Sequence, residues 1–440
     1  MQSRDTRRSR RRLLNPQLLL LLSLLGPGII AANADNDASG IYGYSLAGVQ
    51  YGYGMLWVLV LVTISLGVCQ EMGARMGAVT GKGLADLIRE EYGVKVTFFA
   101  MIILLIANYA TTVSEYAGIT AAIQIFAPPA YQTAARWFVV PLVAGGIWML
   151  VTRGNYKRVE RILLYASLIY LAYIVSAVMA HPPWGEVTHQ MVWPTLKGVK
   201  LDHLYLFAVI NVIGTTITPW GQFYIQSTIR DKGIRSDEYG YTRLDVLFGA
   251  FFTNFIAFFI IVACGKTLFQ AGVDPAAAAA KFNDAGQIAL ALKPVAGSLA
   301  AILFAIGLFN ASCFGAITVP LSTSYAITES LGSESGLGRR AREAPMFVGV
   351  FSFLTFFSAL TVLLLGSRPE YLAFLILLPN IVGAALLPII LVLSLRLINN
   401  KRLMGDKTNG PILNIIAWVT TVVLIILSVT LVIYNLLPGH

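Results

Sequence analysis

The chain has 440 residues, of which 57% are hydrophobic and only 12% charged, and its formal net charge is +10. Its mean hydropathy is +0.71. A soluble domain needs far more charge, so lipid must surround most of the surface. The basic residues lie in short connections between apolar runs, which argues against a nucleic-acid partner. Cys69, Cys264 and Cys313 lie in apolar stretches without paired spacing, which argues against a disulfide framework or a zinc site.

Apolar runs that are long enough to cross a bilayer, roughly 20 residues each, predict eleven membrane helices. Backbone amides in lipid must be hydrogen-bonded internally, so these runs are expected to be helices and not open strands. The interpretation is an all-α polytopic membrane protein with a basic tail over residues 1–16. In chain order the predicted spans are 17–45, 53–78, 95–126, 136–152, 160–181, 202–229, 244–270, 286–328, 346–366, 370–397 and 411–437.

The connections between these spans alternate in charge. Basic clusters precede the first span and follow each even-numbered one, whereas 182–194 and 271–280 contain neither lysine nor arginine. This distribution is the positive-inside pattern of a cytoplasmic N-terminus. With eleven crossings, the C-terminal His440 is then expected outside. The basic clusters lie within 4–12, 75–89, 153–161, 230–243, 339–342 and 396–407.

The N-terminus also allows an alternative interpretation as a secretory signal. The arginines, the leucine-rich run 18–25 and an A-x-A pattern ending at Ala34 are compatible with cleavage before Asp35. Against this, a Gly-Pro-Gly at 26–28 precedes the supposed site, and the apolar pattern resumes after Gly40. Cleavage would also leave ten crossings that start on the wrong side for the charge pattern. A first membrane helix is therefore preferred.

Two of the predicted spans are interrupted by residues that disfavour helix. The first span contains the polar run 33–40 and the sixth contains 214–222, which includes Pro219. These residue types are poor helix formers, and a carboxylate near mid-membrane costs at least a few kcal/mol. For Pro219 alone, a simple packing kink is the alternative. Breaks in the first and sixth spans are typical of a five-plus-five inverted repeat with a site at the midplane, here 17–181 and 202–397, followed by an extra helix at 411–437.

The two breaks contain hard oxygen donors that suit a cation. Carboxylates come from Asp35 and Asp37, and hydroxyls come from Thr215, Thr216 and Thr218. Neither break contains an arginine or lysine that could receive an anion. Because side chains at i and i+2 point apart, both aspartates need not touch one ion, and one of them could instead line the approach.

Short stretches in the first part of the chain form a connected pattern: Gly26-Pro27, Ile30-Ala31-Ala32, Ala47-Gly48, Gly52-Tyr53, Leu56-Trp57-Val58, Thr80-Gly81-Lys82 and Leu84-Ala85. Together they resemble the Nramp family of divalent-metal transporters, without gaps between Gly26 and Arg89. The eleven spans and both breaks extend the likeness to nearly the whole chain. The resemblance implies the leucine-transporter-type fold and metal uptake by alternating access.

The resemblance also implies a metal site in the first helix. The family's D-P-G-N motif lies over residues 37–40, so the aspartate is kept as Asp37 and the asparagine ligand has become Gly40. The backbone carbonyl ligand would be that of Ala34. Asn33 and Asp35 are expected beside the site or along the pathway to it.

In the sixth helix the family has an A-x-x-M pair, whose methionine sulfur touches the metal, followed by Pro-His, which implies Thr215 and Thr218 as the metal-site residues here. Here Thr215 lies over the alanine, Thr218 over the methionine and Trp220 over the histidine. A slip of one residue stays open, because the match over 222–227 fits better with a shift. The family's second histidine appears as Gln226. Thr216, Trp220 and Gln222 are expected beside the site or along the pathway.

Polar residues also occur in or near the predicted spans outside the two breaks. Glu115 matches the family's acidic residue in the third helix, where Thr112 occupies the position of its aspartate partner. Glu115 could also simply be a buried acid bonded to a helix break. Asn310 and Asn380 could add a ligand or hydrate the pathway, but such residues more often hold helices together. Asp202 and Asp245, near the starts of spans, are expected to cap helices.

The departures from the family pattern favour a particular ion. Replacing a thioether by a hydroxyl removes the preference for soft metals, and Gly40 is expected to open volume. Mg²⁺ gives up water reluctantly and typically binds through one or two carboxylates. The chain thus resembles the Nramp-related magnesium transporters of prokaryotes, with partly hydrated Mg²⁺ as substrate, Mn²⁺ as a second candidate, no resident cofactor and a location in the plasma membrane. Neither break contains a histidine, and 346–366 contains no arginine, which predicts weak or absent proton coupling.

Four alternatives differ in class. A transition-metal Nramp transporter with an altered site is closest to the preferred interpretation. A sodium-coupled amino-acid transporter would need a helix N-terminus free to receive a carboxylate, and two nearby aspartates argue against it. An intramembrane aspartyl protease needs carboxylates on two facing helices, whereas Asp35 and Asp37 share one segment. A channel or receptor is the fourth alternative.

Overall fold

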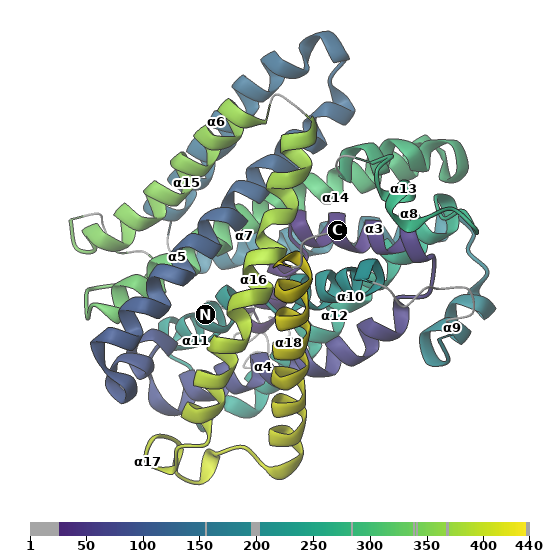
Figure 1. The fold of residues 1–440 in the computed structure, drawn as a ribbon. Coiled ribbons are helices and arrows are strands. Elements are labelled where there is room, and N and C mark those ends of the chain that lie inside the picture. Colours follow the sequence, from purple (N-terminus) through teal and green to yellow (C-terminus); the bar gives the residue numbers. More distant parts are fainter. Residues whose placement is uncertain are drawn as a thin grey trace, which may run out of the picture.

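The computed structural model describes residues 26–154, 156–194, 203–282, 285–337, 339, 342–366 and 369–436. Throughout these ranges the secondary structure is helical, and no strand occurs in them (Figure 1). Nine segments of the described chain are long and apolar enough to cross a membrane. The prediction of an all-α polytopic membrane protein is therefore confirmed. The predicted tail, 1–16, and the start of the first span lie outside the described residues.

The helices of the first half follow the predicted spans. The first span consists of two half-helices of 8 and 14 residues and is not among the nine long segments. The bounds are α2 Pro27–Ala34, α3 Ala38–Tyr51, α4 Leu56–Thr80, α5 Leu84–Phe126, η1 Pro129–Tyr131, α6 Gln132–Arg153, α7 Tyr156–Ile169, α8 Leu171–Met179 and α9 Trp184–Val192.

The second half begins with another pair of half-helices and ends with the predicted extra helix. The bounds are α10 His203–Thr216, α11 Pro219–Lys232, α12 Tyr239–Thr267, α13 Pro275–Ala279, α14 Ala285–Ser330, α15 Pro345–Leu365, α16 Pro369–Ile398, α17 Lys401–Met404, η2 Gly405–Lys407 and α18 Pro411–Leu436. The tenth span is present as α16, of which Leu386–Ile398 counts as a shorter apolar helix. Asp202 lies outside the described residues.

Two long helices bend at glycines. Gly93 in α5 has φ 79° and Gly297 in α14 has φ 86°, conformations that favour glycine over every other residue. Each kink separates a short terminal helix from the long membrane-crossing part. The predicted span 95–126 therefore matches the part of α5 that follows the kink, whereas the short helix before Gly93 was not predicted.

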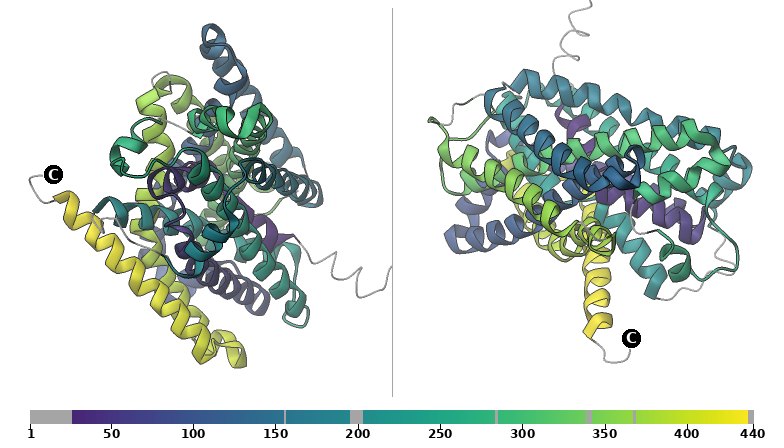
Figure 2. Two further views of the ribbon diagram at one scale, coloured as in Figure 1. Left: turned by 90° about the vertical axis from the view of Figure 1, so that its right-hand side faces the viewer. Right: turned by 90° about the horizontal axis from the view of Figure 1, so that it is seen from above.

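The four half-helices lie inside the bundle and α18 lies outside it. Nearly every residue of α3 and α11 is buried. In contrast, α18 packs along one side, against α4, α10 and α16, and leaves Ile412, Ile415 and Val419 exposed (Figure 2). A lipid-facing surface of this kind is expected for a membrane-spanning helix at the edge of the bundle.

A carboxylate of α12 caps the start of α2. Asp245 was expected to cap a helix, and the helix that it caps is α2 and not α12, which already begins at Tyr239. Its side chain accepts hydrogen bonds from the backbone N–H groups of Gly26 (3.2 Å) and Gly28 (2.7 Å). A Cβ on Gly28 would lie 2.6 Å from the Cα of Val246, so only glycine allows this approach. The first half-helix is therefore anchored to α12.

Candidate cation site at the helix breaks

The break in the first membrane helix is built by local capping. α2 ends at Ala34, and Asp37 is the N-cap of α3. The Asp37 Oδ1 atom accepts hydrogen bonds from the Gly40 N–H (2.6 Å) and from the Ser39 hydroxyl (2.7 Å). An N-cap carboxylate satisfies backbone donors that have no partner in the helix. The predicted interruption is therefore confirmed, and it places Asp37 at the positive end of a half-helix.

The break in the sixth membrane helix uses a threonine and a proline. Thr218 is the N-cap of α11, and its hydroxyl accepts a hydrogen bond from the Gly221 N–H (3.3 Å). Pro219 occupies the first helical position, where a missing N–H costs nothing. The interpretation of Pro219 as a mere kink is wrong, because a new half-helix begins there.

The side chain of Asp35 joins the two breaks. Its Oδ1 accepts a hydrogen bond from the Thr218 hydroxyl (2.8 Å), and its Oδ2 accepts one from the Gln70 amide (3.2 Å). Asp35 is 1% exposed, so both bonds are shielded from water. The breaks therefore meet in one region, and Asp35 lies at their junction. Gln70 was missed, although the polar pair at 70–71 inside the apolar span 53–78 was a visible signal.

Three oxygens from both breaks converge on Gly40. A Cβ there would lie 2.9 Å from the Asp35 carbonyl oxygen, 2.9 Å from Thr215 Oγ1 and 3.3 Å from Asp37 Oδ1. The Thr215 hydroxyl is buried and has no hydrogen-bond partner. A buried hydroxyl without a partner is unfavourable, and coordination of a cation would satisfy it.

The convergence changes two details of the expected site. The backbone oxygen that the structure places beside Gly40 belongs to Asp35, one residue after the expected Ala34. The expectation that Gly40 leaves open volume is wrong for this conformation, because oxygens occupy the space that a side chain would take. Room for water around an ion requires the two breaks to move apart.

A second buried acid fixes the start of α3. Glu115 in α5 accepts a hydrogen bond from the Ala38 N–H (3.2 Å) through Oε2. Its carboxyl group therefore lies beside Asp37, the preceding residue. Glu115 is therefore a buried acid that is bonded to a helix break, as one of the two interpretations of this residue predicts. It also places a second carboxyl group next to the candidate ligand Asp37.

Two of the remaining candidates on the broken helices have hydrogen-bond partners. The Thr216 hydroxyl pairs with the Tyr44 hydroxyl (2.7 Å), and the Asn33 amide donates to the Ile29 carbonyl of its own helix (2.8 Å). Trp220 and Gln222 are buried in α11. None of these four side chains is among the atoms that lie closest to the Cβ position of Gly40, and the Trp220 indole Nε1 is buried without a hydrogen-bond partner.

Asn310 and Asn380 lie between helices. The Asn310 amide donates to the Ala166 carbonyl of α7 (3.1 Å), and the Asn380 amide donates to Asn211 Oδ1 of α10 (2.6 Å). Both contacts hold neighbouring helices together, which is the commoner role of such residues in membranes.

The donor set itself is unusual for a metal centre. Within the described ranges, no group of three or more His, Cys, Asp or Glu side chains could hold a metal ion. A cation at the breaks would therefore depend on hydroxyl and carbonyl oxygens together with Asp37. Such oxygen ligands suit a hard cation.

The fold and this junction of two broken helices define the protein as a multi-pass membrane transporter. Residues 28–434 match the family model described as natural resistance-associated macrophage protein-like, or Nramp. The chain belongs to the Nramp family, a family of transporters, and it is not an enzyme.

Individual relatives agree with this assignment. Two proteins named divalent metal cation transporter MntH, both from Klebsiella pneumoniae, are 27% identical over 429 residues, covering 94% of this chain and 95% of each relative. The solved structure of the Eremococcus coleocola manganese transporter with an aromatic bis-isothiourea substituted compound has a TM-score of 0.75 at 18% identity, covering 94% of this chain and 87% of that one. This likeness confirms the leucine-transporter-type fold.

Proposed function

We propose that the protein moves partly hydrated Mg²⁺ into the cell by alternating access around the junction of the two breaks. As a member of its family it is a divalent metal cation transporter of the Nramp type. The choice of ion rests on one observation, the convergence of oxygens from Asp35, Asp37 and Thr215 beside Gly40. Hard oxygen ligands suit Mg²⁺, whereas a soft sulfur ligand favours transition metals.

Mn²⁺ is the second candidate substrate. The relatives named above are a divalent metal cation transporter and a manganese transporter. Mn²⁺ also accepts oxygen ligands. The position that carries methionine in the family is Thr218 here, and its hydroxyl is engaged with Asp35 and with the start of α11. That engagement supports a role for Thr218 in positioning Asp35.

A competition assay tests the choice of ion. In proteoliposomes, we expect unlabelled Mg²⁺ and Mn²⁺ to inhibit the uptake of labelled Mg²⁺ and Ca²⁺ to inhibit it less. Cd²⁺ itself is expected to be transported poorly. Thr218→Met supplies a thioether and is expected to raise the ratio of Cd²⁺ to Mg²⁺ flux roughly tenfold, equivalent to about 1.4 kcal/mol. Thr218→Ser keeps the hydroxyl and serves as the matched control. Better uptake of Cd²⁺ than of Mg²⁺ by the unmodified protein would support the transition-metal alternative instead.

We also propose that ion entry is coupled weakly or not at all to protons. The breaks contain no histidine and α15 contains no arginine, which leaves few groups for a proton relay. Membrane voltage is sufficient for accumulation, because about 2.3 kcal/mol per charge per 100 mV gives roughly 4.6 kcal/mol for a divalent ion.

Coupling is measured in liposomes that contain a pH-sensitive dye. With the voltage clamped by a potassium gradient and valinomycin, Mg²⁺ entry is expected to leave the internal pH unchanged. Liposomes without protein provide the baseline for proton leak. Acidification in step with Mg²⁺ entry would contradict weak coupling and would assign a transport role to the neighbouring acids Asp37 and Glu115.

The six basic segments support a cytoplasmic N-terminus, an outer C-terminus and a location in a prokaryotic plasma membrane, with lipid around the bundle. The division into a tail at 1–16, repeats at 17–181 and 202–397 and an added helix at 411–437 stays a prediction.

A further inference from the structure

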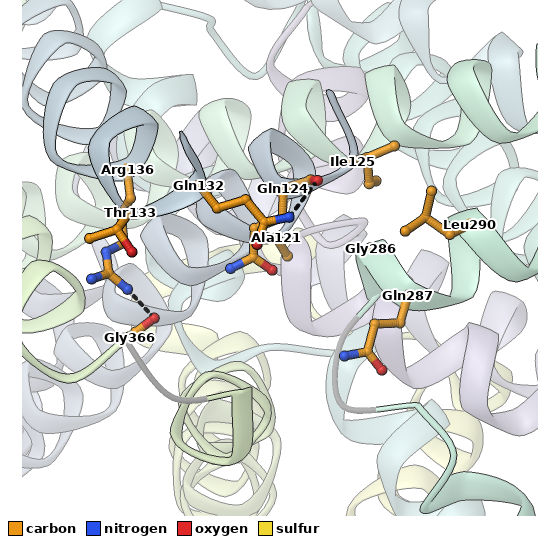
Figure 3. Close-up of a pocket in the computed structure, with 10 residues that line it drawn as sticks. All are labelled: Ala121, Gln124, Ile125, Gln132, Thr133, Arg136, Gly286, Gln287, Leu290 and Gly366. Atoms are coloured by element: carbon orange, nitrogen blue, oxygen red, sulfur yellow. Dashed lines mark hydrogen bonds between the residues drawn. The ribbon is translucent and has the colours of Figure 1, made fainter. Parts of the chain in front are cut away.

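A polar cavity lies at the end of the bundle where α5 and α15 end and where α6 and α14 begin. Its volume is about 270 Å³ (Figure 3). α6 runs from this end to Arg153 in a basic connection, so the cavity lies at the opposite end of the bundle from the basic segments. The residues that matter here are Gln124, Gln132, Thr133, Arg136, Gln287 and Gly366.

Arg136 is the charged group of this cavity. Its side chain is only 5% exposed. One Nη atom donates to the Gly366 carbonyl, while Nε is buried without a hydrogen-bond partner. No carboxylate among the described residues forms an ion pair with it. A buried guanidinium without a counter-charge is unfavourable, so an anion is the missing partner.

The other walls of the cavity also provide hydrogen-bond donors. Thr133 comes from α6 with Arg136, and Gln287 comes from the short first part of α14, whereas the Gln132 amide already donates to the Gln124 carbonyl (3.1 Å) (Figure 3). Side-chain amides and hydroxyls donate hydrogen bonds to anionic oxygens. The planar guanidinium group can donate two parallel hydrogen bonds to one phosphate. Among the described residues, the cavity lining contains no aspartate or glutamate that would repel an anion.

Aromatic residues place this cavity at the level of a membrane surface. Tyr131, Trp137 and Phe138, next to Arg136 in the sequence, are 66%, 49% and 70% exposed. Exposed aromatic residues at helix ends are typical of the interface between lipid tails and headgroups. We infer that the cavity binds a phosphate group, supplied by the headgroup of an anionic phospholipid, with Arg136 as its principal ligand.

Thermal unfolding of the full-length protein in detergent tests this site without measuring transport. Short-chain phosphatidylglycerol is expected to raise the Tm by about 2–4 °C, and zwitterionic phosphatidylcholine is expected to have a much smaller effect. Arg136→Gln should abolish the shift. Arg153→Gln, an exposed arginine at the other end of the same helix, should retain it.

Further measurements keep the inference testable if Arg136→Gln does not fold. Gln287→Leu leaves Arg136 in place and is expected to weaken the lipid-induced shift, and Arg136→Lys should weaken it by removing the guanidinium fork. If inorganic phosphate but not phosphatidylglycerol shifts the Tm in an Arg136-dependent way, the claim that a phospholipid supplies the phosphate group is overturned. A lipid-induced shift that persists in Arg136→Gln, or no shift with either phosphate source, would overturn the site.

Discussion

Replacing Asp37 by alanine is expected to abolish cation uptake, with a loss of about a hundredfold or more, equivalent to roughly 2.7 kcal/mol. The change removes a carboxylate oxygen from the group that converges on Gly40. It also removes the N-cap of α3, which holds Gly40 in place. Uptake of Mg²⁺ and Mn²⁺ into proteoliposomes, at matched protein content, measures the loss.

A second substitution separates the two roles of Asp37. Asparagine is as good an N-cap as aspartate but has no charge. Asp37→Asn is therefore expected to preserve the start of α3 and still to lose most uptake. Asp274→Asn is the matched control, because Asp274 caps the short α13 from an exposed position. Normal uptake by Asp37→Asn would show that the charge is dispensable and would contradict the proposed cation site.

The second large effect is expected from Arg230, at the end of α11 near the basic connections. Its guanidinium lies 3.1 Å from Glu329 of α14 and 3.4 Å from Asp86 of α5. The Glu329 side chain is 0% exposed. Removing one partner of a buried ion pair leaves an uncompensated charge and costs about 3–5 kcal/mol. Arg230→Gln is therefore expected to lower the thermal stability of the purified protein strongly.

Two comparison variants identify the cause of that loss. Adding Glu329→Gln to Arg230→Gln removes the uncompensated charge and should recover much of the stability. Arg235→Gln breaks an exposed pair with Asp237, in which the side chains are 80% and 72% exposed. Such pairs contribute less than about 1 kcal/mol. Equal effects of Arg230→Gln and Arg235→Gln would show that the buried pair does not hold the three helices together.

Much of the fold was predictable because the bilayer imposes one simple rule on the sequence. Apolar runs became helices, and the polar runs 33–40 and 214–222 became breaks. Helix starts were less predictable where a glycine with positive φ adds a short helix, as at Gly93 and Gly297. The helix that Asp245 caps was also not predicted, because the donors to Asp245 lie 217 and 219 residues away in the chain.

The site was predictable in composition more than in geometry. Asp37 and the threonines follow from residue types that end helices. The bond between Asp35 and Thr218 joins residues that are 183 positions apart, and no local pattern indicates which atoms meet. The crowding at Gly40 was missed for the same reason. Loss of a side chain suggests space, but packing of the other break decides whether the space is filled.

The attachment of α2 to α12 has a mechanical consequence. With two backbone amides held by Asp245 and Gly28 pressed onto the neighbouring backbone, α2 cannot swing outward alone. It must take α12 with it or give up those bonds. Bending is then concentrated at the short link after Ala34, beside the Asp35 carboxylate. The peptide segment after Ala34 therefore links the anchored half-helix α2 to α3 and also contacts the start of α11 through Asp35.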